Sequence, residues 1–379
     1  MAYKSVYGEH YLKSTPSIVH NIHKACVCWF IQAMWYGIFS FFWGGFFRFP
    51  NLLRLIPLIF LLSACSPMMY QPGKKIQIAQ IKNNKFYTED GVVLPVKKWL
   101  PEKNIHAVII ALHGFNDYRQ FFQLPGRFFK QHNIACYAYD QRGFGESLNP
   151  GFWPGLNAFS DDLATFIHLI KQQHPDVPVY LLGHSMGGAI IIVTMTQKFA
   201  PSVNGVILAA PAVWGRMTMP WYQTALLWTL SYTLPWMTLT GEGLDIMPSD
   251  NIEMLKGQGR DPLVIKETRV ETIYGLVNLM DAALSSAEKI DNKSLLLYGE
   301  KDQVIPKKPT YQFLRNFHRT AQNRKTIAFY PNGYHMLLRD LQAEIAWKDI
   351  LAWITAKSTP LPSGAEARAE QILFHSSNH

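Results

Sequence analysis

The apolar positions along the chain change their period several times, and these changes predict the elements of the fold. Six runs between residues 107 and 331 are continuously apolar, and stretches with helical spacing separate them. Continuous apolar runs of this length are typical of strands buried on both faces of a parallel sheet. The predicted strands are 107–114, 134–140, 177–183, 203–211, 294–300 and 325–331. The predicted helices are about 119–132, 159–173, 187–199, 308–319 and 341–356.

The pattern just before these runs is different. Residues 75–82 and 91–99 alternate or run apolar and flank a polar stretch that contains Asp90-Gly91, which predicts an antiparallel hairpin. The strand–helix alternation that follows implies right-handed crossovers and helices on both faces of the sheet. The sequence therefore predicts an α/β fold with a mostly parallel sheet.

Residues 212–289 interrupt this alternation. They hold several helical patterns and no convincing strand, and their first third is rich in Trp, Met and Tyr. An insertion between two core strands predicts a helical lid over the carboxyl ends of the sheet, where α/β folds bind ligands; a helical bundle with an ordinary core is the alternative. We therefore predict an apolar signal region at 1–65, a tether at 66–75, a core in two parts at 76–211 and 290–357, a lid at 212–289 and a loose tail at 358–379.

The amino-terminal region resembles a targeting signal. Residues 27–47 have no charge and about the length of a membrane-spanning helix, and a shorter apolar run, 52–65, opens with Arg54 nearby. The run ends in Leu62-Ser63-Ala64-Cys65, which resembles a bacterial lipobox, so we expect Cys65 to be lipidated. Pro67 stands where such signals carry an aspartate for inner-membrane retention, which favours the outer membrane, facing the periplasm. The alternative for the run 52–65 is an ordinary anchor helix that ends in a cysteine. Residues 1–47 are either a real membrane helix or the product of a misplaced start.

Composition narrows the functional classes. The formal net charge is +9, but the first 64 residues hold five basic side chains against one acidic, so the remaining excess is too small to indicate nucleic-acid binding. The four cysteines have no zinc-type spacing with histidines, and no disulfide framework is implied. We expect no metal and no organic cofactor. The sequence carries no signal of oligomeric state.

A candidate nucleophile lies between a predicted strand and a predicted helix. Gly183-His184-Ser185-Met186-Gly187 fits the pattern G-x-S-x-G, which is weak alone, but an apolar strand runs into it and a helix follows at once. So tight a turn leaves no room for side chains beside the serine and presents its hydroxyl above the sheet edge. Ser185 is therefore the predicted nucleophile; the alternative is a glycine-rich turn with an incidental serine.

A serine hydroxyl needs a base, and the base needs an orienting acid. In this fold the acid follows a strand after the nucleophile, and the histidine follows one strand later. Asp302 comes just after the strand 294–300 and is the predicted acid, with Glu300 as the rival. His335 lies in the loop after the strand 325–331 and is the predicted base, because His318 precedes that strand on a predicted helix.

Acyl transfer also needs two backbone N–H donors aimed at the tetrahedral oxygen. Met186, the residue after the nucleophile, should supply one of them. Phe115, in the loop after the strand 107–114, should supply the other. His113 in the same loop is expected to brace it rather than to act as a base.

Together these residues resemble a known family, the monoacylglycerol lipase and lysophospholipase group of α/β-hydrolases related to serine aminopeptidases. The resemblance covers about residues 80–356 and implies an eight-stranded core with a helical cap after the sixth strand. It also implies that Asp140 and Arg142 brace loops. The motifs that carry it, in chain order, are Leu112-His113-Gly114-Phe115, Asp140-Gln141-Arg142-Gly143-Phe144-Gly145-Glu146-Ser147, Gly183-His184-Ser185-Met186-Gly187, Gly299-Glu300-Lys301-Asp302 and Gly333-Tyr334-His335.

The function expected from these residues is hydrolysis of carboxylic esters of lipid-like substrates, such as monoacylglycerols or lysophospholipids, with the membrane as the enzyme's partner. The apolar lid suits a long acyl chain. A peptidase or amidase of the same fold remains open, because the lid carries carboxylates that could bind a substrate amine: Glu242, Asp245, Asp250 and Glu253. A lipoprotein that binds a ligand or partner without catalysis is the alternative from another class.

Overall fold

The computed structural model describes residues 67 and 69–375, except 103, 242, 244, 320–323 and 356–359. The predicted signal region, with the apolar run 27–47 and Cys65, lies outside the described residues. Within the described part of the chain, no helix is both long and apolar enough to cross a membrane.

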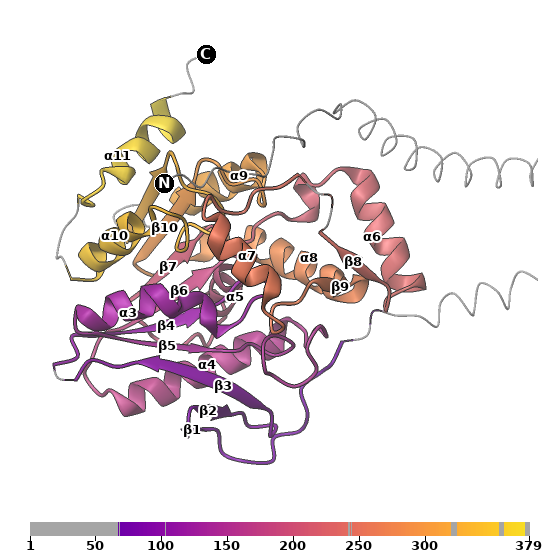
Figure 1. Cartoon of the computed structure of the whole chain (residues 1–379), viewed down its shortest axis with the longest axis horizontal. Coiled ribbons are helices and arrows are strands. Elements are labelled where there is room, and N and C mark those ends of the chain that lie inside the picture. The colour runs from indigo at the N-terminus through magenta and orange to yellow at the C-terminus, as the bar shows by residue number, and fades with distance from the viewer. Residues whose placement is uncertain are drawn as a thin grey trace, which may run out of the picture. The chain divides into compact units, whose positions relative to one another are not determined.

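A nine-stranded sheet forms the centre of the structure (Figure 1), in the order β1-β2-β3-β5-β4-β6-β7-β10-β11. The strands from β5 to β11 in this order pair in parallel, and β3 joins them antiparallel. Every residue of β4, β5, β6, β7 and β10 is buried, as continuous apolar runs predict. All six predicted parallel strands are present: β4 Ala107–Leu112, β5 Ile134–Tyr139, β6 Val179–His184, β7 Gly205–Ala209, β10 Ser294–Gly299 and β11 Lys325–Tyr330.

The antiparallel edge differs from the prediction. It contains three strands, β1 (Gln80–Lys82), β2 (Lys85–Tyr87) and β3 (Val93–Trp99), so the sheet has nine strands instead of eight. Asn83 and Asn84 form the first turn with φ of 50° and 57°, a backbone region that asparagine tolerates better than most residues. Phe86 of β2 is fully buried. The prediction was wrong here because it treated this short stretch as a polar connection.

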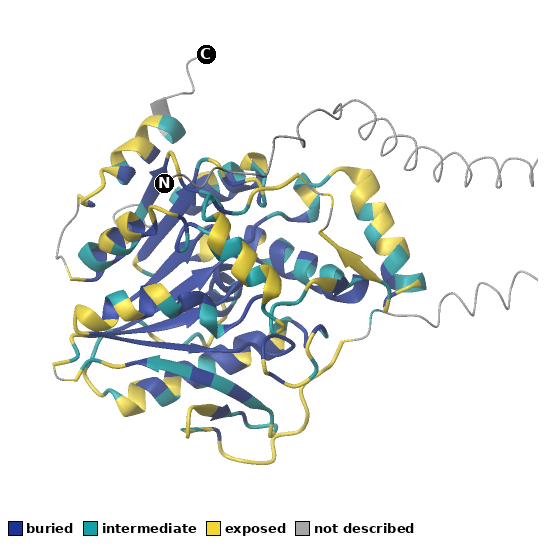
Figure 2. Cartoon of the chain, viewed as in Figure 1, coloured by how far each residue is buried: buried dark blue, intermediate teal, exposed yellow. Residues whose placement is uncertain are grey.

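Helices cover both faces of the sheet, as predicted. Buried side chains of α4, α5 and α9 pack on one face, and those of α3 and α10 pack on the other. Side chains of β4 alternate between these two clusters, as the two-residue period of a strand requires. Figure 2 shows the buried strands between helices that expose their outer sides. The bounds are α3 Gln123–Gln131 (after a 3-10 turn, Arg119–Phe122), α4 Leu156–Gln173, α5 Met186–Met195, α9 Lys307–His318 and α10 Ala343–Thr355.

The predicted lid, 212–289, contains three helices and a feature that the sequence pattern did not indicate. Strands β8 (Thr238–Thr240) and β9 (Glu267–Arg269) form a separate antiparallel pair. Helix α8 packs against α5 and so belongs to the core layer, whereas α6 buries only Ser231. The helices are α6 Trp221–Thr233, α7 Ile252–Arg260 and α8 Val270–Ser285, with short 3-10 turns at Arg216–Thr218 and Ala287–Lys289.

The tail after residue 357 is not loose throughout. It contains α11 (Ala365–Glu370) and a π turn (Gln371–His375), and α11 lies beside β11. Leu361, Ala365 and Ala369 are buried against the core. The prediction missed this packing because three small or isolated apolar side chains do not make a periodic pattern.

Candidate active site

The turn from β6 into α5 places Ser185 above the sheet edge. Its φ of 50° and ψ of −114° are unfavourable for a residue with a side chain, and such strain is held by the surrounding structure. A Cβ at Gly187 would lie 2.2 Å from the backbone oxygen of Leu112, and one at Gly183 would lie 2.5 Å from the backbone nitrogen of Gly188. The glycines of the motif are therefore required by close backbone contacts, as the sequence analysis expects.

Ser185, His335 and Asp302 lie in one hydrogen-bonded chain. The Nε2 atom of His335 is 3.0 Å from Oγ of Ser185, and its Nδ1 atom is 2.8 Å from Oδ2 of Asp302. The three residues follow β6, β11 and β10, whose carboxyl ends lie at the same edge of the sheet. All three are buried. This arrangement can remove a proton from the serine hydroxyl and stabilise the imidazolium that results.

The carboxylate of Asp302 is held by both of its oxygens. While Oδ2 faces His335, Oδ1 accepts hydrogen bonds from the backbone N–H groups of Val304 at 2.8 Å and Ile305 at 3.0 Å. These two backbone donors fix the orientation of the carboxylate, so that Oδ2 faces the imidazole.

Glu300, the rival acid, points elsewhere. Its carboxylate forms a two-pronged pair with the guanidinium of Arg368 from α11, with Nη2 and Oε2 2.9 Å apart. The other histidine considered, His318, is the last residue of α9, whose helix precedes β11. The structure thus brings Asp302, and not Glu300, into contact with His335.

The two predicted oxyanion donors flank the nucleophile. Met186 is the first residue of α5, where backbone N–H groups have no partner within the helix. Phe115 follows Gly114, at which a Cβ would lie 2.8 Å from Nδ1 of His184. The N–H groups of Phe115 and Met186 donate to no backbone oxygen among the described residues.

Buried side chains brace the loops around this centre. His113 donates from Nδ1 to the carbonyl of Gly114 at 2.8 Å and accepts at Nε2 from the N–H of Gln141 at 3.0 Å, while burial lowers its pKa to about 4. Asp140 accepts from the backbone N–H groups of Arg119 and Glu146, both at 2.9 Å. His113 and Asp140 therefore hold loops, as expected.

Arg142 forms the brace that the family resemblance implies. Its guanidinium contacts both carboxylate oxygens of Asp90, at 2.7 and 2.8 Å, and both of Asp162, at 2.6 and 2.8 Å. The two acids lie in the turn before β3 and in α4. Arg142 thus ties the sheet edge to a covering helix, away from the reacting atoms.

Sequence reasoning missed His184, the residue before the nucleophile. Its ring stacks on Phe121 with centroids 4.3 Å apart, and its Nε2 atom is 3.1 Å from the backbone oxygen of His335. Burial holds its pKa well below the usual histidine range, so the neutral ring donates to that oxygen. The variable position of G-x-S-x-G gave no indication of this contact, which ties the nucleophile turn to the histidine loop.

The insertion also contacts the loop that carries His335 and the loop that carries Phe115. Asp340 accepts from the hydroxyl of Ser249 at 2.6 Å and from the N–H of Tyr334 at 2.8 Å. Asn116 donates to the hydroxyl of Thr268 at 2.6 Å. Among the described residues, no cluster of histidine, cysteine, aspartate or glutamate side chains could hold a metal ion.

Comparison with known proteins agrees with this architecture. A family model described as "Serine aminopeptidase, S33" matches residues 103–342. The mouse monoglyceride lipase is 27% identical over 259 residues, which cover 66% of this chain and 82% of that protein. A monoacylglycerol lipase from Mycolicibacterium smegmatis is 23% identical over 268 residues, or 70% and 94%.

A soluble variant of the monoglyceride lipase from Saccharomyces cerevisiae, solved with a substrate analogue, superposes with a TM-score of 0.62. The identity is 19%, and the match covers 76% of this chain and 99% of that one. The predicted α/β-hydrolase fold is thus confirmed. The chain belongs to the serine aminopeptidase S33 family of α/β-hydrolases and resembles its monoacylglycerol lipases.

Proposed function

We propose that this hydrolase cleaves carboxylic esters of lipid-like substrates, such as monoacylglycerols or lysophospholipids, through an acyl-enzyme. The observation that carries the proposal is the hydrogen-bonded chain from Ser185 through His335 to Asp302. Ser185 Oγ attacks the ester carbonyl carbon while its proton moves to Nε2 of His335, and Asp302 stabilises the imidazolium. The N–H groups of Phe115 and Met186 bind the tetrahedral oxyanion.

The second half of the reaction reverses the proton transfer. His335 gives its proton to the leaving alcohol as the carbon–oxygen bond of the ester breaks, which leaves the acyl group on Ser185. A water molecule then transfers a proton to the same nitrogen and attacks the acyl carbon. Collapse of the second tetrahedral intermediate releases the carboxylic acid, and Ser185 recovers its proton from His335.

Two observations favour an ester over a peptide substrate. The similar relatives are named as monoglyceride lipases. Two lid carboxylates that could recognise a substrate amine are engaged elsewhere: Asp250 accepts from the backbone N–H of Leu341 at 2.9 Å, and Glu253 pairs with Lys256 at 2.8 Å on the surface. Asp245 is exposed, and Glu242 lies outside the described residues.

The test is a hydrolysis screen of the full chain that compares acyl esters of graded chain length with aminoacyl amides. The proposal expects hydrolysis of the acyl esters, with rates that rise with chain length, and little hydrolysis of the amides. A preference for the amides would favour the peptidase alternative. A protein inert to every substrate and to serine-directed probes would favour a binding protein.

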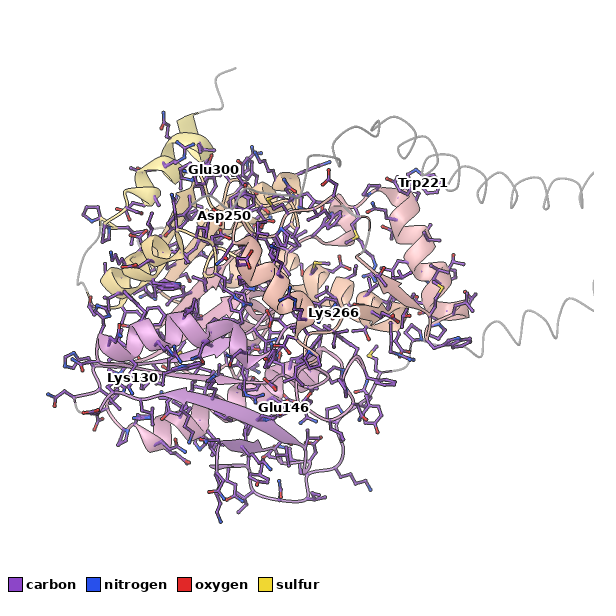
Figure 3. The ribbon with its side chains drawn as sticks, viewed as in Figure 1. Lys130, Glu146, Trp221, Asp250, Lys266 and Glu300 are labelled. Atoms are coloured by element: carbon purple, nitrogen blue, oxygen red, sulfur yellow. The ribbon has the colours of Figure 1, made fainter. Side chains whose placement is uncertain are left out.

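The proposal includes attachment to a membrane through lipidated Cys65, at the bacterial outer membrane facing the periplasm. The exposed side of α6 supports it, since this helix has no charged residue and exposes Trp221, Leu226 and Trp228 by 81%, 59% and 57% (Figure 3 labels Trp221). Trp and Leu on such a face suit the interface of a bilayer.

The start of the described chain lies on the same side as this helix. The N–H of Tyr70 bonds to the carbonyl of Trp153 at 2.8 Å, and its ring contacts Phe152. The guanidinium of Arg269, at the end of β9, lies over the Phe152 ring at 4.4 Å. An anchor at Cys65, five residues before Tyr70, would therefore hold the insertion near the lipid surface.

Fatty-acid labelling and membrane fractionation of Cys65→Ser test the anchor. Loss of label together with release from the membrane is the expected result. A variant that stays membrane-bound, with a wild type that takes up no label, would assign anchoring to residues 27–47.

A further inference from the structure

The carboxyl-terminal segment, residues 360–375, lies beyond the family match, which ends at residue 342. It nevertheless packs against the catalytic core, with α11 beside β11 and with Leu361, Ala365 and Ala369 buried. Strand β11 leads directly into the loop that carries His335. The segment is therefore placed where it can influence that loop.

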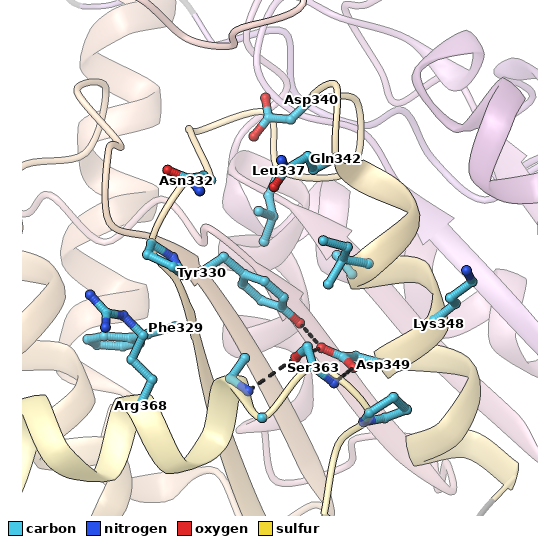
Figure 4. Close-up of a pocket in the computed structure, with 17 residues that line it drawn as sticks. Phe329, Tyr330, Asn332, Leu337, Asp340, Gln342, Lys348, Asp349, Ser363 and Arg368 are labelled. Atoms are coloured by element: carbon cyan, nitrogen blue, oxygen red, sulfur yellow. Dashed lines mark hydrogen bonds between the residues drawn. The ribbon is translucent and has the colours of Figure 1, made fainter.

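One polar connection joins this segment to the end of β11. Asp349 of α10 is fully buried and accepts from the hydroxyl of Tyr330 at 2.7 Å, from the N–H of Ser363 at 3.0 Å and from the Ser363 hydroxyl (Figure 4). Tyr330 is the last residue of β11, five residues before His335. A buried carboxylate with this many donors fixes the groups around it.

A second connection reaches the loop of the acid. Arg368 of α11 binds both carboxylate oxygens of Glu300, which stands two residues before Asp302. The N–H of Glu300 donates to the carbonyl of Tyr330 at 3.0 Å. Arg368 thus binds Glu300, the residue through which the loop of Asp302 contacts the end of β11.

The histidine loop is also held from other sides, since Asp340 accepts from the N–H of Tyr334 and the carbonyl of His335 accepts from Nε2 of His184. An open groove of about 470 Å³ lies between this loop and the segment, and its lining includes Asn332, Leu337 and Ser363 (Figure 4). On the side of this groove, the polar connections through Arg368 and Asp349 border the loop.

We propose that residues 360–375 are a positioning element for the proposed triad, which acts through Arg368–Glu300 and Ser363–Asp349–Tyr330 to keep Asp302 and His335 within hydrogen-bonding distance. The inference rests on the proposed serine-hydrolase function. Arg368 is a positioning residue, since it acts through Glu300 and does not touch the reacting atoms.

The test compares Arg368→Gln with the double variant Arg368→Gln/Glu300→Gln on a soluble ester. Because the side chain of Arg368 is 43% exposed, the single variant should fold. We expect kcat to fall about threefold to fivefold with KM little changed. Because Arg368 acts through Glu300, the double variant should lose no more kcat than the single variant.

The matched control is Arg324→Gln. Arg324 lies at the other end of β11, 60% exposed, with Asp291 3.9 Å away, and its loss should leave both kcat and KM unchanged. If Arg368→Gln lowers only the melting temperature, the segment is merely structural and the inference fails. Asp302→Asn measured in parallel separates the two proposals, since an active Asp302→Asn would overturn the triad itself.

Discussion

Replacement of Asp302 by asparagine should remove catalysis without disturbing the fold. The backbone N–H groups of Val304 and Ile305 both donate to Oδ1, so the asparagine oxygen must occupy that position. The amide nitrogen then faces Nδ1 of His335 and donates to it. The imidazole proton is forced onto Nε2, where it prevents the ring from accepting the proton of Ser185.

The magnitude follows from this wrong tautomer together with the loss of the charge that stabilises the imidazolium. We expect kcat to fall about 10⁴-fold, equivalent to about 5.5 kcal/mol of transition-state stabilisation. The assay is steady-state hydrolysis of a soluble ester, with circular dichroism to confirm the fold.

Glu300→Gln is the matched control. Its carboxylate pairs with Arg368 and not with His335, so the variant should lose less than about tenfold. An Asp302→Asn variant within tenfold of the wild type, or a Glu300→Gln variant as inactive as the expected Asp302→Asn, would refute the reasoning.

A Cβ at Gly187 would lie 2.2 Å from a backbone oxygen of β4, so Gly187→Ala should lower the free energy of unfolding, measured in urea, by about 2–4 kcal/mol. Gly257→Ala is the control, since a Cβ there would meet no atom, and it should not lower this free energy. Burial lowers the pKa of His113 to about 4, so the folded state stays neutral while the unfolded chain takes a proton below about 6.5. Relative to His113→Gln, the wild type should lose about 2 kcal/mol of stability in urea between pH 7 and pH 5, and equal losses would contradict this assignment. Trp221→Ser/Trp228→Ser should slow hydrolysis of a monoacylglycerol in vesicles but not of a soluble ester; equal rates on vesicles would refute a lipid-facing α6.

The sequence anticipated the parallel sheet and the positions of the site residues because both depend on local patterns. Continuous apolar runs mark the buried strands, and the order serine, acid, histidine at successive strand ends places Ser185, Asp302 and His335 at one edge. The position of Asp302 after the strand 294–300 favours it over Glu300 as the acid. The contact of Glu300 with Arg368 could not be foreseen, since 68 residues separate them.

The features that were missed depend on long-range contacts or on very short elements. The contact of His184 with the histidine loop spans 151 residues, and that of Ser249 with Asp340 spans 91. No periodicity along the chain reports such pairs. Strands β1 and β2 have three residues each, too few for an alternating pattern, and only Asn83-Asn84 marked their turn.

The most direct test of the proposed function is labelling of the full chain with a fluorophosphonate probe, followed by peptide mapping, for the wild type and Ser185→Ala. In the proposed mechanism, His335 activates Oγ of Ser185, which lies 3.0 Å from its Nε2 atom. The account predicts a single adduct on Ser185 in the wild type. It predicts no adduct and no ester hydrolysis in a folded Ser185→Ala variant. An adduct on another residue, or labelling that persists in that variant, would contradict the account.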